Sequence, residues 1–78
     1  MRVIKEISFE AFKVTLFAWN QKFILKFEKY HLEQTFKISE LDVSQEEVEE
    51  ILQNDGFVKK VLDRFEEMYQ DWNETLNY

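Results

Sequence analysis

His31 is the only histidine in the 78 residues, and imidazole is the side chain that most often moves protons in catalysis near neutral pH. Its acidic sequence neighbours, Glu28 and Glu33, do not complete a recognisable catalytic set with it. The chain has no cysteine nucleophile, and its three serines stand where strands and helices are expected to begin or end, so turn and cap roles account for them. We therefore expect His31 to be a solvent-exposed turn residue and the protein to be non-enzymatic.

The acidic residues between Asp42 and Glu50 suggest a second kind of chemistry, because hard divalent cations prefer clustered carboxylate oxygens. Their spacing does not support a metal site. An EF-hand loop with Gly56 in its sixth position would place Ile51 first and Leu62 twelfth, where acidic ligands are needed. The single glycine also excludes the glycine-rich loops that bind nucleotide phosphates. We expect no metal, no other cofactor and no small-molecule substrate.

The composition indicates one small cytoplasmic domain that spans residues 1–78. The chain has no cysteine and cannot form disulfides, but 45% of its residues are apolar, which is enough to build a packed core. The N-terminus lacks the apolar stretch of about 7 to 15 residues that a signal peptide needs. The longest uninterrupted apolar run, residues 16–19, is far shorter than the roughly 20 residues that cross a bilayer.

The net charge of −6 is unevenly distributed along the chain. Residues 1–40 carry a net charge of +2, and residues 41–78 carry a net charge of −8. Proteins bind nucleic acids largely through lysine and arginine at phosphates, so an acidic protein is not an obvious nucleic-acid binder. The more basic first half nevertheless keeps that class of function open.

Two alternating runs predict a β-hairpin in this first half. One extends from Phe12 to Trp19 and the other from Lys22 to Glu28, and both are rich in β-branched and aromatic residues typical of strands. A two-residue turn at Asn20-Gln21 makes the numbers of opposed residues add to 41, so Leu16 lies opposite Leu25. In this register one face of the hairpin is entirely apolar.

A third alternating run, residues 32–39, follows a bend at Tyr30-His31 and predicts another strand. Its register stays open, since either Lys26 or Glu28 can lie opposite Glu33. Residues 2–9 show a less regular strand pattern, with Val3, Ile7 and Phe9 as its apolar positions. The first half of the chain is therefore expected to form an antiparallel β-meander of three to four strands.

A helical part, residues 44–76, follows the strands. Ser44 and Glu47 match a capping box, in which each side chain bonds the backbone of the other, and this predicts a helix start. The helix is expected to end near Asn54, with Gly56 in the left-handed conformation and Asp55 capping the next helix.

The second helix carries the clearest amphipathic signal in the chain. When the residues are projected down a helix axis at 100° per residue, the apolar side chains fall within an arc of about 140°. They are Phe57, Val58, Val61, Leu62, Phe65, Met68, Tyr69 and Trp72. This stripe is expected to pack on the apolar face of the hairpin. The predicted fold is therefore α+β, an antiparallel meander of three to four strands followed by two C-terminal helices packed on one sheet face.

The other face of the hairpin is the most informative surface for function, because aromatic side chains are interspersed with lysines there. The candidate interaction face comprises Phe17, Trp19, Lys22, Ile24, Lys26 and Tyr30. An apolar patch of this kind favours a protein–protein interaction module or a homodimer. The alternative is a nucleic-acid-binding module, in which rings stack on bases and lysines contact phosphates. In a third interpretation, the first helix or the N-terminal strand covers these side chains.

Overall fold

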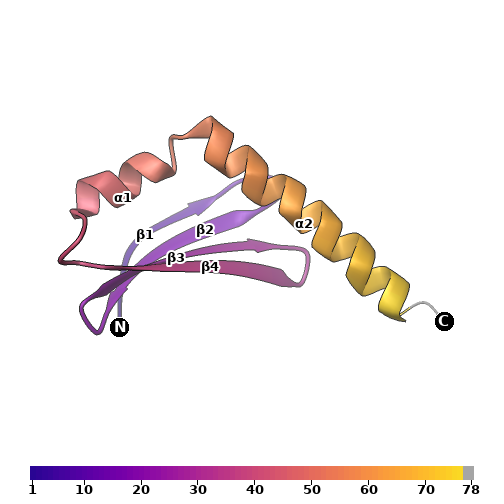
Figure 1. Cartoon of the computed structure of the whole chain (residues 1–78), viewed down its shortest axis with the longest axis horizontal. Coiled ribbons are helices and arrows are strands. Elements are labelled where there is room, and N and C mark those ends of the chain that lie inside the picture. The colour runs from indigo at the N-terminus through magenta and orange to yellow at the C-terminus, as the bar shows by residue number, and fades with distance from the viewer. Residues whose placement is uncertain (77–78) are drawn as a thin grey trace.

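The computed structural model describes residues 1–76 and shows an antiparallel sheet with two helices on one of its faces (Figure 1). The elements in chain order are β1 (Arg2–Ser8), β2 (Lys13–Trp19), β3 (Lys22–Lys29), β4 (Leu32–Ser39), α1 (Gln45–Ile51) and α2 (Asp55–Leu76). The strand order in the sheet is β1-β2-β3-β4, so each strand pairs with its neighbours along the chain. The predicted α+β meander with two C-terminal helices is confirmed.

The turn between β2 and β3 determines which side chains share each face of the sheet. Asn20 and Gln21 have φ angles of 53° and 61°, the left-handed values that a two-residue type I′ turn requires. Leu16 lies opposite Leu25, and the β2–β3 register matches the predicted alignment at every pair from Lys13–Glu28 to Trp19–Lys22.

The register of β4 places Glu28 opposite Glu33, one of the two alternatives left open by the sequence. Carboxylates at directly opposed positions repel each other unless a cation lies near both. The Nζ atom of Lys26 lies 3.7 Å from Glu28 Oε1 and 3.8 Å from Glu33 Oε1. This lysine offsets the repulsion, and the register sets Phe36 opposite the buried Leu25.

β1 completes the sheet beside β2 and is irregular. Its register with β2 shifts between Val3 and Lys5, and the intervening Ile4 packs against the core. This β-bulge explains why the alternation of residues 2–9 is less regular than that of the later strands.

The capping box at the start of α1 is present as predicted. Glu47 N–H donates to Ser44 Oγ at 3.2 Å, and Ser44 N–H donates to Glu47 Oε1 at 3.0 Å. Ser44 is therefore the N-cap of α1.

The junction between α1 and α2 differs from the prediction. The N–H groups of residues 52–54 donate to carbonyl oxygens three residues earlier, which satisfies the end of α1 without a left-handed residue. Gly56 lies in the first turn of α2 and has no positive φ. Asn54 takes the role predicted for Asp55, because its Oδ1 accepts the Phe57 N–H at 3.1 Å.

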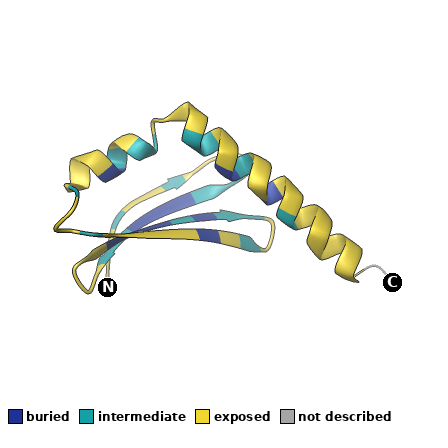
Figure 2. Ribbon diagram, viewed as in Figure 1, coloured by how far each residue is buried: buried dark blue, intermediate teal, exposed yellow. Residues whose placement is uncertain are grey.

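The core lies between the sheet and both helices, as the buried inner sides of the elements in Figure 2 indicate. It consists of Val14, Leu16, Phe23, Leu25 and Phe27 from the sheet and Val48, Val61 and Phe65 from the helices. The buried side chain of Gln34 joins β4 to α2. Its Nε2 donates to the Val61 carbonyl oxygen at 2.9 Å, and its Oε1 accepts from Arg64 Nη1 at 3.2 Å.

The C-terminal end of α2 projects beyond the sheet (Figure 1). Val61 and Phe65 are fully buried and Met68 is half-buried, but Trp72 is 50% exposed and Leu76 is 49% exposed. The expectation that the whole apolar stripe packs on the sheet therefore holds as far as Met68 and not for Trp72.

Candidate functional site

The sheet surface opposite both helices, which we call the open face, contains most of the predicted interaction residues. The strand registers align Val3, Phe17, Ile24 and Lys37 in one row across its four strands. Both α1 and α2 pack on the other face of the sheet, and β1 forms one edge of the sheet beside β2 (Figure 1). The interpretation in which the first helix or the N-terminal strand covers this face is therefore wrong.

The predicted residues that share the open face are Phe17, Trp19, Lys22, Ile24 and Lys26. Trp19 is 51% exposed and Phe17 is half-buried, whereas Ile24 is only 7% exposed. Ile24 sits between the large side chains of Phe17 on β2 and Lys37 on β4, and we attribute its burial to these neighbours. The accessible apolar surface is therefore formed by Trp19, Phe17 and the exposed Val3.

The lysines of the open face fall into two groups. Lys26 contacts two glutamates, and its Nζ lies 5.9 Å from the centre of the Phe17 ring, within cation–π range. Lys13 pairs with a glutamate of β1 at 3.9 Å. Lys22 and Lys37 form no ion pair with any of residues 1–76. Two unpaired cations therefore border the apolar end of the open face.

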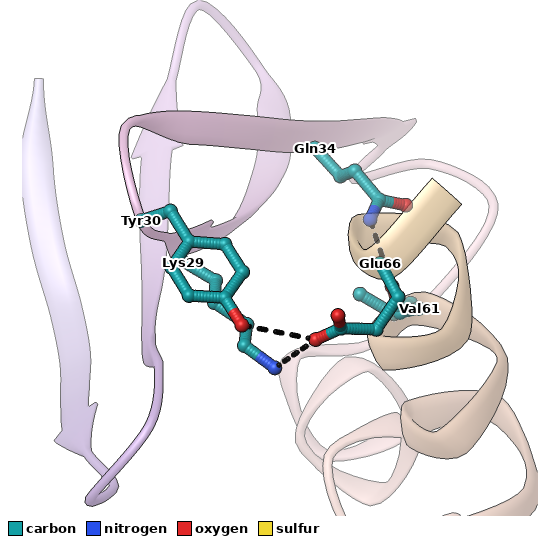
Figure 3. A network of polar contacts seen from close by, with 5 residues as sticks. All are labelled: Lys29, Tyr30, Gln34, Val61 and Glu66. Carbon is teal, nitrogen blue, oxygen red and sulfur yellow. Dashed lines mark hydrogen bonds and ion pairs between the residues drawn. The ribbon is translucent and has the colours of Figure 1, made fainter. Parts of the chain in front are cut away.

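Tyr30, the sixth predicted residue, lies apart from the other five and faces α2 (Figure 3). Its hydroxyl donates to Glu66 Oε1 at 3.1 Å, and its ring stacks on Tyr69 with the ring centres 4.3 Å apart. Its φ of 60° turns the chain between β3 and β4. The sequence places Tyr30 at this bend but contains no local signal for the long-range contact with α2.

Lys29 binds the same carboxylate as Tyr30. Its Nζ lies 3.0 Å from Glu66 Oε1, and this hydrogen bond raises the pKa of Lys29 above its ordinary value. The pKa of Glu66 is lowered, first by the hydrogen bond from Lys29 and then by the one from Tyr30. These three residues hold the β3–β4 turn against α2 and leave the open face to the other five predicted residues.

No protein-family model, curated protein or solved structure matches the chain. Its function must therefore be inferred from its own surfaces.

Neither His31 nor the acidic residues between Asp42 and Glu50 belong to a group of metal ligands among residues 1–76. His31 is exposed in the β3–β4 turn, as predicted. Within residues 1–76, no three His, Cys, Asp or Glu side chains are grouped so that they could hold a metal ion. No helix in this range is long and apolar enough to cross a membrane.

An apolar cavity beside α1 is a feature that the sequence analysis missed. It has a volume of about 340 Å³ and is lined mainly by apolar residues of β3, β4 and α1 and by the start of α2. Phe36 and Ile38 line it from β4, and each is 37% exposed. Their alternation is visible in the sequence, but only the β4 register places both beside α1.

Proposed function

We propose that the protein is a small non-enzymatic interaction domain of the cytoplasm that binds a partner protein through its open face. The observation that carries this proposal is the exposure of Trp19 on a sheet surface whose opposite side holds both helices. Small monomeric proteins rarely expose aromatic patches without a binding role, and aromatic anchors supply much of the energy of protein interfaces.

The surroundings of Trp19 define the chemistry of the partner. Val3 and Phe17 extend the apolar contact toward β1, while Lys22 and Lys37 border it with positive charge. An apolar pocket with carboxylates at its rim complements this surface. The proposed partner is therefore a protein whose binding surface has an acidic rim.

Substitution Trp19→Glu tests this proposal. Tagged wild-type, Trp19→Glu and Lys60→Glu proteins serve as baits under equal conditions, and bound proteins are quantified by mass spectrometry. Lys60→Glu is the control, because it introduces the same side chain at an exposed position of α2, away from the open face. We expect Trp19→Glu to weaken capture of the partner by about tenfold or more, and Lys60→Glu to leave it unchanged. A partner captured equally by all three proteins would not bind the open face.

Sedimentation of the same three proteins tests whether the partner at the open face is a second copy of the chain. A dimer that Trp19→Glu alone converts to monomer would make this face a homodimer interface. A mass that Trp19→Glu does not change leaves a different protein as the partner.

Nucleic-acid binding is the second candidate function, favoured by the two lysines near Trp19 that have no ion-pair partner among residues 1–76. In a Trp72→Phe background the emission comes from Trp19 alone. Base stacking would quench this emission on addition of a single-stranded oligonucleotide, and added salt would reverse the effect. If the oligonucleotide does not change the Trp19 emission at low salt, nucleic-acid binding by this face is excluded.

A further inference from the structure

The two edges of the sheet differ in how they can meet another strand. β1 has a bulge between Val3 and Lys5, and bulges discourage edge-to-edge pairing. β4 is eight residues long, and its register with β3 runs without a shift from Lys22–Ser39 to Lys29–Leu32. Its outer edge has no strand partner within residues 1–76. A regular unpaired edge of this length is a template for an added strand.

The charges of β4 select a second copy of the same strand as the partner. Two β4 strands that pair antiparallel are related by a twofold axis normal to the sheet. Opposed residues must point to the same face of the sheet, so one residue of β4 lies opposite its own copy at the centre of the pair. With Thr35 at the centre, Glu33 lies opposite Lys37 of the second copy, and this contact occurs twice. Centring on residue 33 would oppose two glutamates, and centring on residue 37 would oppose two lysines.

The helix side of the sheet fits the same register. Leu32 lies opposite Ile38 of the second copy, and Gln34 lies opposite Phe36. Ile38 and Phe36 are the partly exposed residues that line the apolar cavity, so the pairing would cover apolar surface that the monomer leaves open.

The projecting end of α2 adds to this contact. Trp72 lines a shallow hollow beside Leu32, which places it next to Ile38 of the second copy. In the same register His31 lies opposite Ser39 of the second copy. The projecting end of α2 in one copy would therefore extend toward the segment that follows β4 in the other copy. Leu41 in that segment is 92% exposed.

We propose that the protein forms a homodimer in which two β4 strands pair antiparallel about Thr35, giving a continuous eight-stranded sheet. The axis is normal to the sheet, so the helices of both copies lie on one side and the two open faces form one surface on the other. This interface goes beyond the proposed function, because it uses the sheet edge and leaves Trp19 free for a partner.

Disulfide trapping tests the register. The chain has no cysteine, so Thr35→Cys introduces a single thiol. In the proposed dimer the two thiols lie on directly opposed residues, whose Cα atoms are about 4.5 to 5.5 Å apart in antiparallel pairs. Ser39→Cys is the matched control on the same strand, because the two copies of residue 39 would be roughly 27 Å apart at 3.4 Å per residue. Under mild oxidation, we expect the Thr35→Cys variant to form a covalent dimer at a much higher rate than the Ser39→Cys variant. Equal rates, or no covalent dimer, would overturn the proposal.

Charge reversal tests the pairing without a covalent bond. Glu33→Lys and Lys37→Glu each place like charges opposite each other twice, and we expect each to raise the dimer Kd by about tenfold. The double variant exchanges the two charges and should return the Kd to within about threefold of the wild-type value. Sedimentation equilibrium measures the Kd, and circular dichroism confirms that each variant is folded.

Two results of the sedimentation experiment would contradict the proposed interface. One is a wild-type mass that remains at 9.6 kDa up to about 1 mM protein. The other is a double variant that dimerises no better than the two single variants. Trp19→Glu should leave the mass unchanged, so failure of the edge interface and failure of the open-face proposal are separate results.

Discussion

At the scale of single residues, polar side chains at one end of the sheet hold β4 and its turn against α2. Gln34 is buried, and its amide uses both a donor and an acceptor in contacts with α2. Lys29 at the end of β3 and Tyr30 in the turn both bind Glu66 (Figure 3). These contacts join residues far apart in the sequence, so the sequence alone could not predict them. Tyr30 for this reason departs from the predicted interaction face.

Gln34→Ala should lower the free energy of unfolding by about 1 to 3 kcal/mol, because it removes both hydrogen bonds and leaves space in a buried site. Urea unfolding measures the change. Lys60→Ala is the control at an exposed position of α2, and it should change stability by less than about 0.5 kcal/mol. Equal effects of the two substitutions would show that Gln34 does not join β4 to α2.

The ion pair of Glu66 makes stability depend on pH in a defined direction. Its pKa is lowered from an ordinary value of 4.5, so the interaction stabilises the folded state above that pH and is lost as the pH falls below it. The raised pKa of Lys29 adds stability that is present below 10.5 and is lost as the pH rises above that value. Urea unfolding of wild type and Glu66→Gln between about pH 7 and about pH 3 should show a stability difference that shrinks on acidification. A difference that stays constant would contradict the pairing.

At the scale of elements, local signals predicted the parts of the fold that depend on nearby residues. The Asn20-Gln21 turn sets the β2–β3 register, and the capping box at Ser44 sets the start of α1. The β4 register could not be predicted, because Lys26 offsets a glutamate pair that looks unfavourable by itself. Gly56 was placed wrongly because three short-range hydrogen bonds end α1 without a left-handed residue.

Gly56→Ala distinguishes the two descriptions of the α1–α2 junction. An added Cβ would lie 3.4 Å from Asn54 Oδ1, which is an ordinary contact distance. Alanine also has a higher helix propensity than glycine. We expect thermal or urea unfolding to show an increase in stability of about 0.4 to 1 kcal/mol. A left-handed Gly56 would instead make alanine destabilising. Asn54→Ala should lower stability by about 1 kcal/mol through loss of the cap.

At the scale of the whole molecule, the helices cover one face of the sheet and leave the other face and the β4 edge open (Figures 1 and 2). The alternation of β2 and β3 was enough to predict which side chains of the hairpin share the open face. Val3 and Lys37 were missed because their places depend on the β1 bulge and the β4 register. The open face is therefore a product of the complete sheet, and its proposed role concerns a surface rather than a single residue.

Site-specific photo-crosslinking at position 19 tests the proposed role of the open face most directly. Trp19 is replaced by a photoreactive phenylalanine analogue, and the same analogue at the exposed Lys60 of α2 serves as the control. We expect irradiation in cells to give one dominant protein adduct from position 19 that position 60 does not give. Adducts that are the same from both positions, or no adduct from position 19, would contradict the conclusion that the open face binds a partner protein.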